Sequence, residues 1–392
     1  MRFFLIEKPP GVPHIALKLL RLVGVSQTQS ERYRYVPMFV LFLLTIAIPK
    51  IAFGYPNFET SIIGLAELFF QTNRFVGVLL LVLYSDSIFE LVRQSEFFAK
   101  KGKSITIFFL SETSPVAEYL TKMDTQVTKI TKLYLTALLV PANFYSYSPI
   151  VATLWKYYNT YENDTVPEFT LHMEESFYRL NVREKLDHYL IFGAIMVPIS
   201  FLCALVGTAK LVSILSLIKY CTIYFQLVKV KLEEVGRSQN YASDIRSAIQ
   251  MHQSALSCAD VLHDITAPIM LLQLVLCIMV WSSMLLYFTV AGFNTQFISL
   301  FILFMFDTTE TFGYCYLGNQ LSDESARVAS VVYDCRWEGM PPALRKDLQL
   351  IMLRAQRSVG ITAGKFCFMN MEQFGEVVKT TYSFFVVLRD QF

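Results

Sequence analysis

Seven apolar runs constrain this 392-residue chain more than any other feature of its sequence. They lie at about 36–53, 61–84, 130–155, 189–212, 267–291, 297–317 and 371–388. A helix needs roughly 20 residues to cross the hydrocarbon core of a bilayer, so each run is about long enough. Charged residues make up 17% of the chain, below the ~25% of a typical soluble domain. The sequence therefore predicts an all-α membrane protein with seven transmembrane helices.

The segments that connect these runs differ in charge. Lysine and arginine gather before the first run and after the second, fourth and sixth runs. The segment 156–188 is instead acidic, and it contains the sequon Asn163-Asp164-Thr165. Because positively charged loops stay in the cytoplasm, the N-terminus is predicted to be cytoplasmic and the C-terminus extracellular. Asn163 would then lie outside the cell, where it is a candidate glycosylation site.

Helical spacing of apolar residues continues from the membrane runs into the basic segments. It is clearest at Leu211, Ile214, Leu215 and Ile218, and it recurs before the fifth and seventh runs. An apolar stripe outside the membrane needs a packing partner. We therefore expect long helices that project into a cytoplasmic packing domain, which also joins subunits. The predicted division is a cytoplasmic N-terminal segment at 1–35, transmembrane helices 1–4 with an external loop (156–188) at 36–212, cytoplasmic helices at 213–266, transmembrane helices 5–6 at 267–317, cytoplasmic assembly helices at 318–370, and a terminal helix at 371–392.

Residues that carry catalytic or metal chemistry do not cluster in this sequence. The five histidines are isolated from one another, and no two cysteines have CxxC spacing. The seven cysteines lie in apolar runs or in segments predicted to be cytoplasmic, which gives no support for a disulfide framework. The mixed residues before the first run lack the pattern of a cleavable signal peptide. We expect no enzyme activity, cofactor, metal site or nucleic-acid partner.

The terminal run differs from a lipid-facing anchor because polar residues interrupt it. These are Glu376, Lys379, Thr380, Thr381 and Ser383. Polar side chains at membrane depth must face protein or water, since unpaired polar groups in hydrocarbon are costly. A terminal helix of this kind predicts a pore or a binding cavity.

A metabotropic seven-helix receptor coupled to G proteins is one interpretation of seven runs. The predicted termini are inverted relative to that class. The chain also lacks Asp/Glu-Arg-Tyr after the third run and Asn-Pro-x-x-Tyr in the seventh. These features argue against the metabotropic alternative.

The end of the terminal run resembles one family of receptors. Thr381-Tyr382-Ser383-Phe384-Phe385-Val386-Val387-Leu388 is similar to the end of the seventh span in insect odorant receptors. Residues 326–337, 350–356 and 361–364 resemble the cytoplasmic run of the same family, so the likeness covers about 321–388. It implies a tetrameric, ligand-gated, non-selective cation channel. Each subunit of such a channel lines a central pore with its seventh helix and binds odorant in its outer half.

Two related classes lie close to this resemblance. Gustatory receptors end with Thr-Tyr, five apolar residues and Gln-Phe, whereas Gln391-Phe392 of this chain is out of that register. A gustatory-type receptor channel is the remaining alternative. The shared odorant co-receptor carries a long insertion between the fourth and fifth spans, which this chain lacks. The resemblance therefore implies a ligand-tuning subunit that joins the co-receptor in a heterotetramer, surrounded by membrane lipid. It also implies a multi-pass protein of the plasma membrane, in olfactory neuron dendrites, that detects small volatile odorants.

Candidate pore and ligand residues follow from helical spacing and this resemblance. The predicted pore residues are Tyr382, Phe385, Leu388 and Arg389, of which Phe385 and Leu388 would form an apolar ring that gates by dewetting. The predicted odorant site is an apolar cavity with few polar groups, in the outer halves of spans two, three, four and six. Its candidate residues are Leu68, Phe69, Thr72, Phe144, Tyr145, Tyr147, Ser148, Val151, Ile191, Phe192, Ile195, Phe301 and Phe304.

Overall fold

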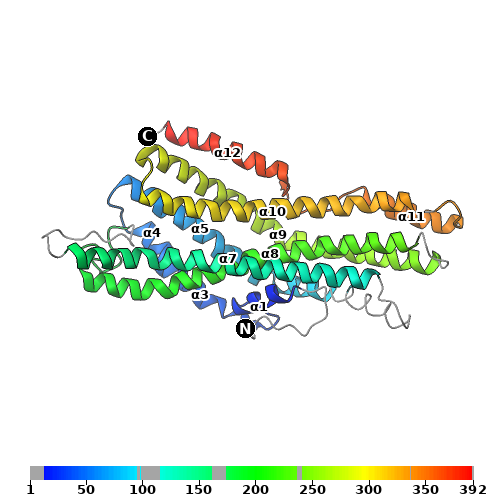
Figure 1. The fold of residues 1–392 in the computed structure, drawn as a ribbon, viewed down its shortest axis with the longest axis horizontal. Helices are drawn as coiled ribbons and strands as arrows, with labels where there is room; N and C mark the ends of the chain where they lie inside the picture. Colours follow the sequence, from blue (N-terminus) through cyan, green and yellow to red (C-terminus); the bar gives the residue numbers. More distant parts are fainter. Residues whose placement is uncertain are drawn as a thin grey trace.

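The computed structural model describes residues 13–94, 98, 115–160, 174–235, 241–335 and 337–390. Within these ranges, the side chains at 115–117, 134–135, 137–149, 160, 295 and 388 lie outside the description. The described chain is an elongated bundle of long helices that run along its main axis (Figure 1). This arrangement confirms the prediction of a largely helical protein.

The N-terminal third contains short helices followed by one long helix. In chain order these are α1 (His14–Leu22), α2 (Gln29–Arg32), α3 (Tyr35–Phe42), a π-helical segment (Leu43–Ala47), α4 (Ile48–Ala52) and α5 (Phe58–Leu83). The π-helical segment was not predicted, and it lies just before Pro49. Because proline has no N–H to donate to the preceding turn, it favours this local change of helix type.

Four long helices make up most of the bundle. They are α7 (Pro115–Thr160), α8 (Leu186–Val235), α9 (Tyr241–Ala291) and α10 (Thr295–Asp334). With 50 residues, α8 is about 75 Å long, far more than the roughly 30 Å of a hydrocarbon core. Helices of this length must project beyond a bilayer, as the continuing apolar spacing predicted.

Two helix starts near the same end of the bundle are capped by asparagine. The side chain of Asn57 accepts a hydrogen bond from the backbone N–H of Thr60, at 2.9 Å, at the start of α5. The side chain of Asn294 likewise accepts from the N–H of Phe297, at 2.8 Å, at the start of α10. Each cap satisfies a backbone donor that has no partner within its helix.

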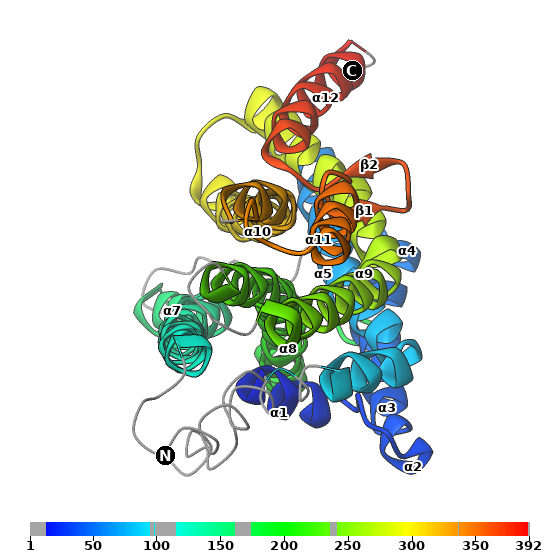
Figure 2. The same cartoon turned by 90° about the vertical axis from the view of Figure 1, so that its right-hand side faces the viewer.

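The C-terminal part combines a short helix, a hairpin and the terminal helix. These are α11 (Pro342–Ala355), the antiparallel pair β1 (Thr362–Ala363) and β2 (Cys367–Phe368), and α12 (Met371–Arg389). Gly364 turns the hairpin at a φ of +56°, and its N–H donates to the carbonyl oxygen of Ala267 on α9, at 2.8 Å. The hairpin therefore anchors the start of α12 to the bundle. Beyond it, α12 leans away and packs mainly along α9 and α10 (Figure 2).

Four helical stretches among the described residues are long and apolar enough to cross a membrane. They are Gln29–Ala52, Phe58–Leu83, Leu186–Val235 and Tyr241–Ala291, and they cover all or nearly all of the first, second, fourth and fifth predicted spans. The other three predicted spans lie in α7, α10 and α12. Charged residues such as Glu310 and Lys379 lower the hydropathy of α10 and α12. The count of seven transmembrane helices stays a prediction.

Candidate ligand cavity and buried ion network

Lys210 of α8 is the centre of a polar network inside the bundle. Its side chain is fully buried, and its Nζ lies 2.7 Å from Glu310 Oε1 on α10. The same ammonium donates to Asn73 Oδ1 on α5 and to Gln273 Oε1 on α9, each at 2.8 Å. One cation therefore joins four helices, and each of its three donors has an acceptor from a different helix.

Gln273 extends this network toward a second carboxylate. Its Nε2 donates to Asp307 Oδ1 at 3.1 Å and to Thr311 Oγ1 at 3.0 Å. Asn73 Nδ2 donates to Gln273 Oε1 at 2.8 Å. Since Asn73, Gln273, Asp307 and Thr311 are all buried, these contacts replace hydrogen bonds that water would otherwise make, although Asp307 Oδ2 has no hydrogen-bond partner among the described residues.

Two glycines make room for the long cationic side chains of this region. A Cβ atom on Gly77 of α5 would lie 2.8 Å from Lys210 Cε. A Cβ atom on Gly207 of α8 would lie 2.8 Å from Arg74 Nε on α5. Arg74 also places its guanidinium 3.8 Å from the ring centroid of Phe70, which is a cation–π contact. Each helix therefore provides a glycine opposite the other helix's cation.

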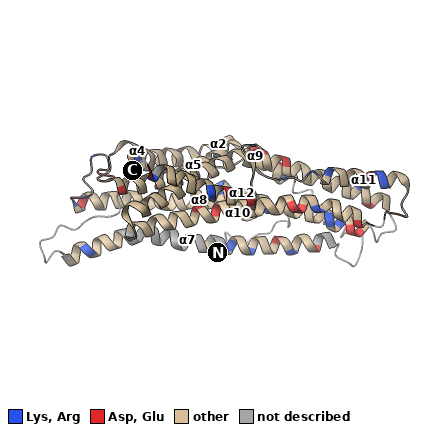
Figure 3. Ribbon diagram, turned by 90° about the horizontal axis from the view of Figure 1, so that it is seen from above, with Lys and Arg blue, Asp and Glu red and all other residues tan. Residues whose placement is uncertain are grey.

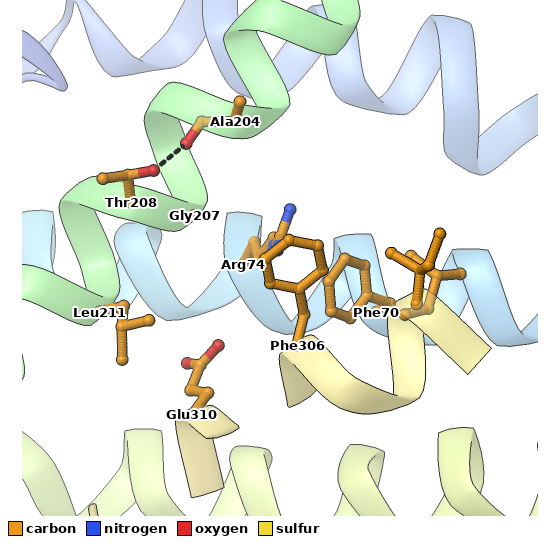
Figure 4. A pocket seen from close by; sticks show the side chains of 10 residues that line it. Phe70, Arg74, Ala204, Gly207, Thr208, Leu211, Phe306 and Glu310 are labelled. Carbon is orange, nitrogen blue, oxygen red and sulfur yellow. Dashed lines mark hydrogen bonds between the residues drawn. The ribbon is translucent and has the colours of Figure 1, made fainter. Parts of the chain in front are cut away.

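A cavity of about 70 Å³ lies beside the network, between α5, α8 and α10 (Figure 4). Aromatic and aliphatic side chains form most of its wall, with three polar side chains among them. Its lining residues are Phe70, Arg74, Ala204, Gly207, Thr208, Leu211, Ile302, Leu303, Phe306 and Glu310. An apolar cavity with a few convergent polar groups is typical of a site for a small molecule.

The predicted odorant residues do not line this cavity. Leu68 and Phe192 are buried, Phe69, Thr72 and Phe304 are half-buried, and Val151, Ile191, Ile195 and Phe301 are exposed on the single chain. The side chains of Phe144, Tyr145, Tyr147 and Ser148 lie outside the described part of α7, as does the whole of Asn163. On α5 and α8, the predicted residues lie closer to the start of each helix than the residues that line this cavity. The role of the predicted set in odorant binding stays a prediction.

The predicted pore residues lie along α12. Tyr382 is exposed, Phe385 is half-buried against the bundle, and their ring centroids are 6.3 Å apart. Arg389 forms an ion pair with Asp390, at 3.0 Å. The side chain of Leu388 lies outside the description. Tyr382 and Phe385 therefore share a side of α12, while the ring predicted from Phe385 and Leu388 stays a prediction.

A second ion cluster ties the acidic segment to α4 and to the first half of α5. Lys50 Nζ lies 2.7 Å from Glu67 Oε2 and 3.1 Å from Glu174 Oε1. The backbone N–H of Glu175 donates to the carbonyl oxygen of Gly54, at 2.7 Å. The described end of the acidic segment is thereby held against the connection between α4 and α5.

Sequence reasoning missed the central network and its cavity. Lys210, Asp307 and Glu310 are ionisable residues within runs that were predicted to cross the membrane, and such residues are a recognised signal of function. Figure 3 shows many of the other charged residues gathered toward the α11 end. Their position within apolar runs was therefore a signal that could have identified these three residues, although they belong to no recognised motif.

Comparisons with known proteins give a consistent family. The family model described as 7tm Odorant receptor matches residues 118–382. Odorant receptor 2a of Drosophila melanogaster is 32% identical over 95 residues, which are 24% of this chain and 24% of that protein. Odorant receptor 10 of Aedes albopictus is 24% identical over 179 residues, or 45% of this chain and 48% of that protein. These matches thus span a quarter to a half of the curated relatives.

A solved structure extends the likeness to the whole fold. The insect olfactory receptor OR5 from Machilis hrabei, in complex with eugenol, superposes with a TM-score of 0.75 at 10% identity. The superposition covers 97% of this chain and 98% of that one. Because the family model covers more than half of the chain, this protein belongs to the insect odorant receptor family.

Proposed function

We propose that this chain is the odorant-binding subunit of a heteromeric, ligand-gated, non-selective cation channel in the plasma membrane. It crosses the membrane seven times, with a cytoplasmic N-terminus and an extracellular C-terminus. Its partner is the odorant co-receptor, and its ligands are small volatile organic molecules. The terminal helix α12 lines the pore.

The packing of α12 is the observation that carries this proposal. Val377 and Thr381 are buried against the bundle, whereas Glu376, Lys379 and Tyr382 are exposed on the single chain. Charged side chains at membrane depth require protein or water around them. Partner subunits that surround a water-filled pore supply both, and they cover the face that this chain leaves open.

The arrangement of the helix ends supports the proposed topology. Figure 1 places α4 and the C-terminal end of α12 at one end of the molecule, and α11 at the other. The connection that follows α4 and the C-terminus that follows α12 are both predicted to be extracellular, whereas α11 belongs to the predicted cytoplasmic domain. The segments assigned to each side of the membrane thus lie together.

The short connection between α8 and α9 supports a ligand-tuning role. Helix α8 ends at Val235 and α9 begins at Tyr241, which leaves no room for the long insertion of a co-receptor. The Anopheles gambiae odorant receptor coreceptor is nevertheless a relative, 22% identical over 158 residues. Shared ancestry with that protein favours assembly of the two kinds of subunit around one pore.

Odorant binding would act on the pore through the helices that contact α12. The predicted outer cavity closes around the ligand, and α12 moves outward to widen the ring at Phe385 and Leu388. The Arg389–Asp390 ion pair neutralises the positive charge at the pore mouth, where an unpaired arginine would repel cations.

Current recordings test this proposal directly. The chain is co-expressed with an odorant co-receptor in cells that lack G-protein signalling, and a panel of volatile molecules, eugenol included, is applied. Cation currents that need both chains support the proposal, and cells with the co-receptor alone provide the control. Responses that return only when G proteins are supplied would overturn it in favour of a metabotropic receptor.

A further inference from the structure

Three lysines lie along one face of α7, at the end of the helix that is predicted to enter the membrane from the cytoplasm. Lys122 and Lys129 are exposed, and Lys132 is half-buried. At about 100° per residue, Lys122 lies about 20° and Lys132 about 60° from Lys129 around the helix. The third predicted span begins at about residue 130, so Lys129 and Lys132 lie at its first turn. This lysine stripe therefore brings positive charge to the cytoplasmic boundary of the membrane.

The carboxylates of α7 lie away from Lys129. The only acidic residues of this helix are Glu118 and Asp124. Asp124 lies about 140° from Lys129 around the helix, and its Oδ1 accepts a hydrogen bond from the Tyr220 hydroxyl of α8. Glu118 lies about 16 Å from Lys129 along the helix axis, beyond the ~10 Å over which exposed charges interact at 0.1 M salt. The acids of α7 therefore do not cancel the positive charge at Lys129.

Exposed apolar side chains accompany the lysines at the start of the predicted span. Ile130 is 65% exposed and Leu133 is 70% exposed. Side chains of a helix tilt toward its N-terminus, which for α7 is the predicted cytoplasmic end. The ammonium groups of Lys129 and Lys132 are thus directed back toward the headgroup layer, while Ile130 and Leu133 lie against the acyl chains.

The position of α7 in the bundle turns this face toward lipid. Among the described elements, α7 packs mainly along α8, whereas α12 packs mainly along α9 and α10. Figure 2, viewed along the long axis, shows α7 and α12 on different sides of the bundle, with α10 between them. Because α12 lines the proposed pore, the partner subunits gather on its side of the molecule. The face of α7 that carries the lysines is therefore left to the surrounding membrane.

We propose that this face of α7 binds an anionic phospholipid of the cytoplasmic leaflet, with its headgroup at Lys129 and Lys132 and an acyl chain on Ile130 and Leu133. Lys122 lies about 10 Å further from the membrane, where it adds attraction for the anionic headgroup layer. Each lysine near such a surface contributes about fivefold in affinity. The inference rests on the topology of the proposed function, but lipid binding itself requires neither an odorant nor a current.

Lipid-dependent thermal stabilisation of the purified full chain in detergent tests the binding. Phosphatidylserine and phosphatidylcholine with the same acyl chains are titrated in turn at about 0.1 M salt. We expect phosphatidylserine to bind about tenfold or more tightly than phosphatidylcholine, and about 0.5 M salt to reduce this preference. Equal affinities for the two lipids would overturn the proposal, whatever the current recordings show.

A matched pair of double variants locates the binding. Lys129→Gln with Lys132→Gln removes charge from the lysine stripe, whereas Lys156→Gln with Lys185→Gln removes two exposed lysines at the opposite predicted side of the membrane. We expect only the first double variant to lose the preference for phosphatidylserine, since the second pair lies in the acidic segment 156–188. A preference that survives in the first double variant would place the lipid elsewhere. If that variant does not fold, the two lipids on the unchanged chain still decide.

Chemical protection of Lys129 separates a lipid from a protein as the occupant of this face. The purified chain is acetylated with an amine-reactive reagent in the presence of phosphatidylserine, of phosphatidylcholine, or of the co-receptor without added lipid. Peptide mass spectrometry then measures the acetylation of Lys129. We expect phosphatidylserine to shield Lys129, and the exposed Lys156 to react equally in all three samples. Shielding by the co-receptor in place of phosphatidylserine would assign this face to a subunit contact and overturn the proposal.

Discussion

Gly77 and Lys210 fit each other across the interface of α5 and α8. A Cβ atom at position 77 would lie 2.8 Å from Cε and 2.9 Å from Cδ of the lysine. The lysine stem cannot move aside freely, because its ammonium is held by acceptors on three other helices. The missing side chain at position 77 is therefore a condition for burying this cation.

Gly77→Ala is expected to destabilise the protein by about 1–3 kcal/mol, the usual cost of overpacking a core. Thermal unfolding of the purified chain in detergent measures the change. Gly375→Ala is the matched control, since a Cβ atom there would meet nothing within 4 Å and α12 would gain helix propensity. Equal stability of the two variants would show that the lysine stem relaxes at no cost.

Lys210→Met is expected to cost about 3–5 kcal/mol, because it leaves the Glu310 carboxylate buried without its cation. Fluorescence-detected gel filtration and thermal unfolding should show a lower yield and a lower melting temperature. Lys379→Met is the control, since this lysine forms an exposed i, i+3 pair with Glu376 and should change stability little. A similar effect of both substitutions would mean that the network contributes no more than a surface pair.

The sequence predicted the helices well because their signals are local. Apolar runs and helical spacing depend only on neighbours in the chain. The network could not be assembled from sequence, since Asn73 and Gln273 are 200 residues apart and meet only when α5 packs on α9. The predicted odorant residues stay a prediction, and residues such as Ile191 are exposed on the single chain because helical spacing does not show which face meets another helix.

We expect the protein to lose stability in mild acid because of the buried His252. It is buried in the part of α9 that precedes the fifth predicted span, and its ring lies edge-on to Phe225, with centroids 6.3 Å apart. Burial, helped by the charge of Arg354, lowers the pKa of His252 to about 4. Between this value and the unfolded pKa of about 6.5, the unfolded chain binds a proton that the folded chain does not.

Stability should therefore fall as the pH drops through this window, by about 2 kcal/mol from pH 7 to pH 5. Unfolding of the purified chain at the two pH values measures the loss. His252→Leu removes the titrating group, so this variant should lose about 2 kcal/mol less stability than the unchanged chain between pH 7 and pH 5. His188→Gln, in a different part of the fold, should keep the full loss. An unchanged acid response in His252→Leu would rule out this histidine as the source.

Phe385 offers a test of the gate in the proposed channel. Its ring is half-buried against the bundle, beside the exposed ring of Tyr382. An apolar ring closes a narrow pore by excluding water, so a hydroxyl group at this position should let water and cations enter without ligand. Phe385→Ser is therefore expected to raise the basal cation current severalfold when the chain is co-expressed with a co-receptor.

The neighbouring residue provides the control for this change. Phe384 lies one position earlier on α12 and is 36% exposed, so it faces a different direction from Phe385. Phe384→Ser makes the same chemical change and should leave the basal current low at equal surface expression. Basal currents that rise equally in both variants would indicate a general loosening of α12. A low basal current in Phe385→Ser would exclude this ring as the gate, because the closed pore would then owe its barrier to other residues.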